Sequence, residues 1–199
     1  NASQSVLVSN NQVSLSPVGA NDGVFATGSQ SVSVEGNQIT TAGSGNYGIR
    51  LVGLVTDSKI QNNQIDGFIG VSPVMRGVGV FSEPLSGNAP YLGSVMDNTI
   101  RRCSDGIVIQ GVSTGIITDF TISDNLLESI VHTQDGRSNT FDDIGTKGIG
   151  LDFCAGIKIT GNTVTGTGVL LDNARNPVVL GDDVFPLPIF ARNSDTLHI

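Results

Sequence analysis

A six-residue pattern, apolar–x–x–Asn–x–apolar, recurs along the chain and limits the folds that it can adopt. It reads IQNNQI at 60–65, and the other copies are VSNNQV at 8–13, VEGNQI at 34–39, VMDNTI at 95–100, ISDNLL at 122–127 and ITGNTV at 159–164. The shared residues are Asn11, Asn37, Asn63, Asn98, Asn125 and Asn162, with separations of 26, 26, 35, 27 and 37 residues. A weaker copy, LGDDVF at 180–185, has Asp183 in the Asn place. A drifting period of this size predicts a solenoid whose turns carry insertions.

A second pattern follows each copy, in which Gly opens an apolar segment that alternates with period two. Such alternation predicts a β-strand. We also expect a short strand before and after each Asn, which makes three strands per repeat. The 26 Gly residues and 5% aromatic content fit many short strands and tight turns. The Gly-led segments are GVFATG at 23–28, GIRLVG at 48–53, GVGVFS at 77–82, GIVIQG at 106–111, GIGLDF at 148–153 and GVLLDN at 168–173.

From about Ser5 to Phe185, these two patterns resemble the right-handed parallel β-helix superfamily, the pectate-lyase-like proteins with parallel β-helix repeats. The resemblance implies an all-β solenoid of about six to seven coils and three parallel sheets. We therefore expect a parallel β-helix over residues 1–185. Residues 186–199 are expected to form a C-terminal cap or tail, because Pro186 and Pro188 cannot donate to a strand ladder.

The repeated Asn has a structural explanation. Asn tolerates the left-handed backbone conformation better than any residue except Gly, so it suits a sharp turn between strands. Coils stacked about 4.8 Å apart also allow each side-chain amide to bond to its neighbours above and below. We therefore interpret the six Asn residues as a structural ladder and not as a ligand site.

Charge and hydropathy exclude some partners. The formal net charge is −8, which disfavours nucleic acid and anionic membrane surfaces because both need a positive face. No apolar run is long enough to span a bilayer. Cys103 and Cys154 form neither a disulfide framework nor a metal-ligand spacing, so we expect two unpaired cysteines. The chain enters a repeat without a cap, a Met start or a signal-peptide pattern, so we expect a piece of a larger chain or an end covered by another chain.

Long insertions border the Gly-led strands on both sides. They run from Asp66 to Gly77, from Ser82 to Gly93 and from Glu128 to Gly148. Insertions in solenoids become loops on one face, where function is concentrated. In the enzymes that the chain resembles, the outer face of the corresponding sheet is the polysaccharide groove. A polysaccharide is therefore the expected partner.

Alternation predicts which residues point outward from the Gly-led sheet. One expected column is Phe25, Arg50, Gly79, Val108, Gly150 and Leu170, and the next is Thr27, Val52, Phe81, Gln110, Asp152 and Asp172. The apolar residues in these columns have two explanations, which are cover by the long loops or a subunit contact as in trimeric phage tailspikes. A homotrimer is therefore one alternative for the assembly.

The Asp152 and Asp172 pair carries the strongest chemical hint. Two neighbouring carboxylates suit general acid–base chemistry, as in glycoside hydrolysis, or bind Ca²⁺, or are ordinary solvated acids. The candidate catalytic residues are Asp152, Asp172, Asp142, Asp143, His132 and Lys147, and the candidate substrate-binding residues are Arg50, Phe81, Gln110, Arg137 and Arg175. FDDIG at 141–145 resembles the paired acids of polygalacturonases, but the chain lacks their His-Gly and Arg-x-Lys motifs and an Arg placed as in pectate lyases.

Three functions remain open at this point. The first is a carbohydrate-binding or scaffolding β-helix module of a larger bacterial cell-surface or phage tail protein. The second is a polysaccharide lyase, hydrolase or epimerase, and the third is a purely structural spacer. Each of them places the protein outside the cell, on a cell surface or on a virion. No cofactor is required by the sequence, and Ca²⁺ is the one that the acid pair could hold.

Overall fold

The computed structural model describes most of the first two thirds of the chain and separate strands beyond it. The described residues are 5–16, 21–29, 31–43, 45–53, 57–70, 77–83, 92–111, 117–130, 148–152, 154–164, 169–172, 178–180, 183–184 and 190–192. Of residue 92, residue 152 and the strands after 164, only the backbone is described.

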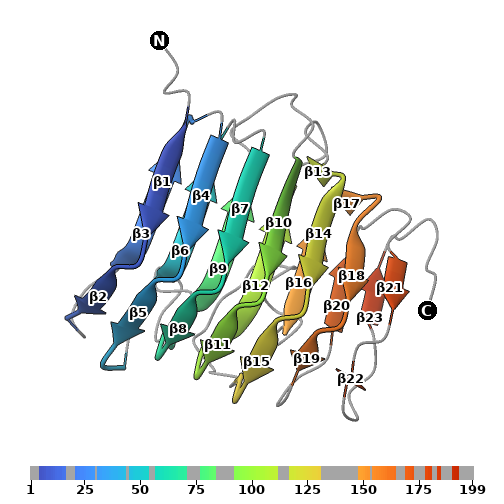
Figure 1. Cartoon of the computed structure of the whole chain (residues 1–199). Coiled ribbons are helices and arrows are strands. Elements are labelled where there is room, and N and C mark those ends of the chain that lie inside the picture. Colours follow the sequence, from blue (N-terminus) through green and yellow to red (C-terminus); the bar gives the residue numbers. More distant parts are fainter. Residues whose placement is uncertain are drawn as a thin grey trace.

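Three parallel sheets of seven strands each run the length of the solenoid, and neighbouring strands in each sheet come from successive coils (Figure 1). Sheet A contains β1 (Val6–Ser9), β4 (Ser31–Glu35), β7 (Asp57–Gln61), β10 (Leu92–Met96), β14 (Phe120–Ser123), β18 (Lys158–Thr160) and β21 (Val178–Leu180). Sheet B contains β2 (Gln12–Leu15), β5 (Gln38–Thr41), β8 (Gln64–Asp66), β11 (Thr99–Arg101), β15 (Leu126–Glu128), β19 (Thr163–Val164) and β22 (Asp183–Val184).

Sheet C is built from the Gly-led segments. It contains β3 (Asp22–Thr27), β6 (Tyr47–Val52), β9 (Val78–Glu83), β12 (Asp105–Gln110), β16 (Ile149–Asp152), β20 (Val169–Asp172) and β23 (Phe190–Arg192). A separate short pair joins β13 (Ile117–Thr118) to β17 (Cys154–Ala155). The all-β fold of three parallel sheets expected from the sequence is confirmed.

The core lies between the three sheets and is made of stacked aliphatic columns. In sheet B, for example, Ile39, Ile65 and Ile100 are partners in consecutive strands and are almost completely buried. Branched side chains suit these positions because they pack well on a pleated surface. The same arrangement recurs in sheets A and C, and all three sheets contribute to one continuous hydrophobic core.

The Asn ladder predicted from the repeat is present, and hydrogen bonds join its six members. The backbone N–H and the side-chain Nδ2 of Asn63 both donate to Oδ1 of Asn98, at 3.0 Å each. Asn63 Nδ2 also donates to the carbonyl oxygens of Val34 and Gln61. The same N–H and Nδ2 contacts to the following Oδ1 join Asn11, Asn37, Asn63, Asn98, Asn125 and Asn162 in order.

The expectation that the ladder Asn itself takes the left-handed conformation is wrong. The left-handed residue is the one that precedes each Asn, for example Asp97 before Asn98, with φ of 55°. All six such residues are of types that tolerate this conformation: Asn10, Gly36, Asn62, Asp97, Asp124 and Gly161. The turn and the ladder are therefore separate devices on adjacent residues.

A column of glycines marks the start of sheet C. A Cβ on Gly48 would lie 2.6 Å from the carbonyl oxygen of Gly79 and 2.4 Å from a methyl carbon of Ile65. Gly23, Gly79 and Gly106 meet the next coil in the same way. This column corrects the expected register of the third coil, because Gly79 and not Gly77 is the equivalent of Gly48.

The end of the solenoid also differs in register from the sequence interpretation. Asp183 pairs with Thr163, which follows the ladder residue Asn162. Asp183 therefore does not occupy the Asn column, which falls on position 182, outside the described residues. β23 pairs with β20, so strand pairing continues past residue 185. The assignment of 186–199 to a cap or tail stays a prediction.

Both cysteines are free and buried, as expected from the sequence. Burial raises the pKa of the Cys103 thiol to about 12, so the thiolate does not form near neutral pH. Among the described residues there is no helix that could cross a membrane.

Candidate functional site

The outer face of sheet C differs from the expected face because the third coil is shifted by two residues. Arg50 pairs with Phe81, and Phe81 pairs with Val108. Val52 pairs with Glu83. The first outward column is therefore Phe25, Arg50, Phe81, Val108 and Gly150, and the second is Thr27, Val52, Glu83, Gln110 and Asp152. Gly79 is not an outward member of the first column.

A second, small hydrophobic cluster lies on this outer face. It consists of Tyr47, Val78, Phe81 and Val108, separate from the main core. Phe81 is 0% exposed, and its ring stacks on Tyr47 with a centroid separation of 4.8 Å. Phe81, predicted to bind substrate, is therefore buried within this cluster. Phe25, at the first coil, remains 54% exposed.

Arg50 lies at the centre of a polar group on the same face. Its guanidinium donates a hydrogen bond of 2.7 Å to Glu83 and lies 3.9 Å from Asp22. It also lies over two rings, 4.8 Å from the centroid of Tyr47 and 5.6 Å from that of Phe25. These contacts fix the guanidinium beside the exposed ring of Phe25.

The charges of this group are partly removed from water. Burial raises the pKa of the Asp22 carboxyl, and the charge of Arg50 and a backbone hydrogen bond from Tyr47 offset this only in part. Burial alone would lower the pKa of Arg50, but the hydrogen bond to Glu83 and the electrostatic influence of its neighbours raise it overall. Asp22 Oδ1 and Arg50 Nε are buried and have no hydrogen-bond partner among the described residues. The carboxylate of Asp22 is therefore held at a cost in stability.

The structure places the Asp152 and Asp172 backbones at the ends of neighbouring strands. Asp152 ends β16 and Asp172 ends β20, and Leu151 pairs with Leu171 just before them. The side chains of both acids lie outside the described part of the chain. Their roles in catalysis and Ca²⁺ binding stay predictions. Gln110 is partly exposed at the end of β12, beside Asp152 in the register.

Six other predicted site residues fall outside the described residues: His132, Arg137, Asp142, Asp143, Lys147 and Arg175. Among the side chains that are described, no three His, Cys, Asp or Glu are grouped as metal ligands would be.

A groove on the outer face of sheet B was missed in the sequence. It crosses three coils and is lined by Gln38, Thr40, Gln64, Ile65, Asp66, Thr99 and Arg101. The repeat does contain a sequence pattern for this groove, because the ladder Asn is followed by Gln in the first three copies and by Thr in the fourth copy. Gln and Thr carry no strong chemical signature, so only the stacking of the coils makes these positions a surface.

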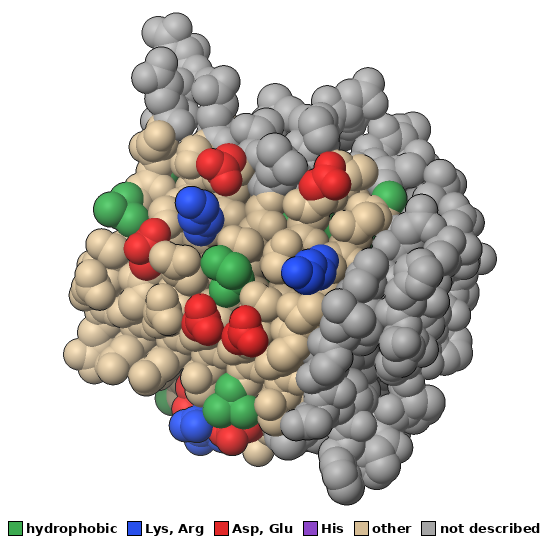
Figure 2. Space-filling model, turned by 45° about the vertical axis from the view of Figure 1, so that its right-hand side comes forward, with side chains coloured by type: hydrophobic (Ala, Val, Ile, Leu, Met, Phe, Trp, Pro, Cys, Tyr) green, Lys and Arg blue, Asp and Glu red, His purple; other side chains and the backbone are tan. Residues whose placement is uncertain are grey.

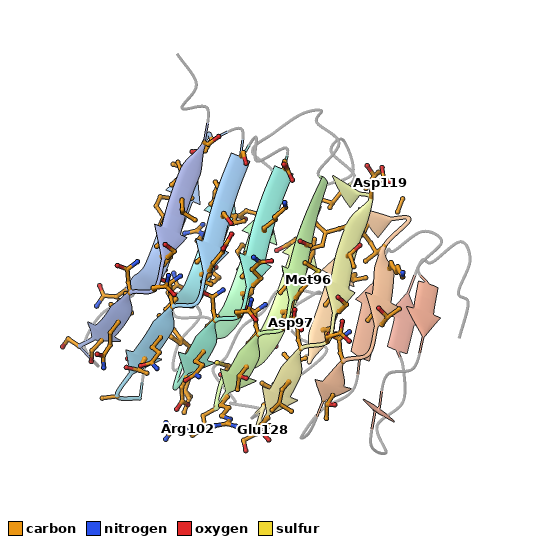
Figure 3. The ribbon with its side chains drawn as sticks, viewed as in Figure 1. Met96, Asp97, Arg102, Asp119 and Glu128 are labelled. Carbon is orange, nitrogen blue, oxygen red and sulfur yellow. The ribbon has the colours of Figure 1, made fainter. Side chains whose placement is uncertain are left out.

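Ion pairs compensate the charges at the end of this groove. Arg102 binds Asp66 with two hydrogen bonds, of 2.6 and 2.5 Å. Arg101 donates to Glu128 at 2.5 Å. Figure 3 shows Arg102 and Glu128 together at one edge of the solenoid, away from Asp97 and Asp119. In the view of Figure 2, acidic and basic side chains are interspersed over the described surface.

A family model described as the right handed beta helix region matches residues 84–184, just over half of the chain. No curated protein and no solved structure matches the chain.

Proposed function

Because the chain belongs to the right-handed β-helix family, we propose that it is a carbohydrate-binding module whose ligand lies on the outer face of sheet C. The observation that carries the proposal is the exposed ring of Phe25 beside the fixed guanidinium of Arg50. Sugar rings stack on aromatic faces through their apolar C–H groups, and a guanidinium donates hydrogen bonds to their hydroxyls.

Pre-organisation supports this site. Arg50 is held by Glu83 and by the Tyr47 ring, so little side-chain entropy is lost when a ligand binds. The partly buried Asp22 lowers stability, yet it keeps the guanidinium in place from the other side. Charged groups that are held at a cost to the fold are concentrated at functional sites.

The test is binding of the whole chain to a polysaccharide panel, with the variants Phe25→Ala and Arg50→Gln. Each is expected to weaken binding by about tenfold, as loss of a stacking contact or of charge-assisted hydrogen bonds implies. Leu7→Ala is the matched control, because Leu7 is also exposed and lies in the same coil, but on sheet A. Unchanged binding by both site variants would show that sheet C is not the binding face.

Catalysis is a second candidate because the backbone positions of Asp152 and Asp172 end neighbouring strands of the same sheet. Two carboxylates on one sheet face suit acid–base chemistry on a glycosidic bond. Reducing-sugar and unsaturated-uronate assays on the same panel, with and without Ca²⁺, test this function. Turnover by the parent chain that disappears in the double variant Asp152→Asn, Asp172→Asn would support the catalytic function. If the parent chain shows no turnover, carbohydrate binding without catalysis is the function that remains.

A further inference from the structure

The side chains that follow the ladder Asn residues form a column on the outside of sheet B. Gln12 pairs with Gln38, Gln38 with Gln64, and Gln64 with Thr99. Gln12, Gln38 and Gln64 are exposed, and Thr99 is half-buried. Neighbouring coils lie about 4.8 Å apart, so this column offers the same amide group at a constant spacing.

These polar groups are not used by the fold. Among the described residues, the side-chain amides of Gln38 and Gln64 and the hydroxyl of Thr40 make no hydrogen bond. Each amide therefore presents one acceptor and two donors to whatever lies in the groove. Gln38, Thr40 and Gln64 all line it.

The groove is electrically balanced. Its two charged lining residues, Asp66 and Arg101, are each engaged by an opposite charge, Arg102 and Glu128. The chain as a whole carries a net charge of −8. No uncompensated positive charge in the groove would attract an anionic polymer, so its chemistry favours an uncharged ligand.

The groove also lies on the face of a sheet and not at its edge. The backbone groups of β5 and β8 are paired within sheet B, so a peptide could not bind here by adding a strand. The available contacts are amides and hydroxyls, which match a ligand that carries hydroxyl groups along its length.

We propose that this groove is a second binding site, distinct from the one on sheet C, for a neutral polysaccharide chain lying across the coils. The amides of Gln12, Gln38 and Gln64 exchange hydrogen bonds with hydroxyls of successive sugar units. Thr99 continues this column into the next coil, and Thr40, two residues after Gln38, contributes a hydroxyl beside it. The two sites lie on different sheets, so neither requires the other.

The experiment measures binding of the whole chain to dextran, laminarin, galactomannan and xyloglucan, with polygalacturonate as the anionic comparison. The double variant Gln38→Ala, Gln64→Ala removes two amides from the groove. Gln61→Ala is the matched control, because it removes the same side chain from the coil of Gln64 but on sheet A. Melting temperatures of all variants check that the fold is unchanged.

We expect the parent chain to bind at least one of the neutral polymers. The double variant should bind that polymer about tenfold more weakly, as loss of one or two neutral hydrogen bonds implies, while Gln61→Ala binds like the parent. Binding should also change little between low and high salt, because no net charge is involved.

Three outcomes would overturn the proposal: no binding of the parent to any neutral polymer, equal binding by the double variant, or binding that salt abolishes. Phe25→Ala measured in the same series separates the two sites. If only Phe25→Ala weakens binding, the sheet C site stands and the sheet B groove fails. If only the double variant does so, the groove stands and the sheet C site fails.

Discussion

Two columns of amides run side by side through the first three coils, one residue apart in sequence, and they are used in opposite ways. Asn37 and Asn63 are 1% exposed and every polar atom of their side chains is paired. Gln38 and Gln64, the residues that follow them, are exposed, and their side chains are unengaged among the described residues. The comparison teaches that an amide stabilises this fold only where water cannot reach the backbone groups that it serves.

The largest expected effect comes from breaking the buried column. Asn98→Ala removes the acceptor of two bonds from Asn63 and the donor to the carbonyls of Ile60 and Met96. The stranded groups remain buried, so we expect a loss of roughly 3 kcal/mol in the free energy of unfolding. Denaturant unfolding monitored by circular dichroism measures it.

Gln64→Ala is the control for that measurement, because it removes an amide from the neighbouring exposed column. We expect its free energy of unfolding to equal that of the parent within about 0.5 kcal/mol, as for other surface substitutions. Similar losses for both variants would contradict the distinction between a structural column and an unengaged one.

The second effect concerns Cys103, which is buried at the bend before sheet C. The pKa of its thiol is raised from an ordinary value near 9 to about 12. The unfolded chain therefore loses this proton at a lower pH than the folded chain does. The contribution of the neutral thiol to the free energy of unfolding is complete below about pH 9. It is lost as the pH rises toward 12. We expect the slope of unfolding free energy against pH above 9 to be less negative in Cys103→Ala by up to about 1.4 kcal/mol per pH unit.

A smaller effect separates the turn from the ladder. Asp97 takes the left-handed conformation, and the equivalent residues in two other coils are Gly36 and Gly161. We expect Asp97→Ala to be less stable than Asp97→Gly by about 1 kcal/mol, because a Cβ is disfavoured in this conformation. Melting temperatures of the two variants check this, and the opposite order would show that the ladder Asn alone determines the turn.

The smallest expected effect concerns a buried polar group that lacks a hydrogen-bond partner among the described residues. The hydroxyl of Ser82 is buried on the inner side of sheet C and has no partner among the described residues. Ser82 stands in register with Leu51, which in turn pairs with Ala26. We expect Ser82→Ala to raise the free energy of unfolding by up to about 1 kcal/mol, because it removes an unsatisfied polar group. A loss of stability in the same unfolding assay would mean that the hydroxyl is paired after all.

The sequence was sufficient for the architecture because one residue type, Asn, identifies the same point of six successive coils. The register of the third coil was not predicted, since GVGVFS contains two glycines that each precede an apolar residue, and a shift of two residues preserves the alternation. Only the close contact of Gly48 with Gly79 decides between them. That shift kept Glu83 out of the expected site.

Only part of the candidate site could be predicted from the sequence, and the reason is again the pairing between coils. Arg50 was identified from its outward position, but Tyr47 and Asp22 lie before the Gly that opens their segments, so alternation within those segments did not include them. Their proximity to Arg50 depends on pairing between coils that are far apart in sequence. Contacts of this kind produce no pattern within a single segment of the sequence.

The Asn ladder has a direction. Each ladder Asn before Asn162 donates its backbone N–H and one side-chain Nδ2 contact to Oδ1 of the following ladder Asn. Each ladder oxygen after Asn11 therefore accepts from the preceding coil. At Asn11 the series ends on an oxygen to which no described residue donates. A coil that stacks against this end must therefore supply donors, and two such ends brought face to face would oppose acceptor to acceptor. The Asn11 end of the ladder therefore presents an acceptor, and it cannot pair with a second copy of itself.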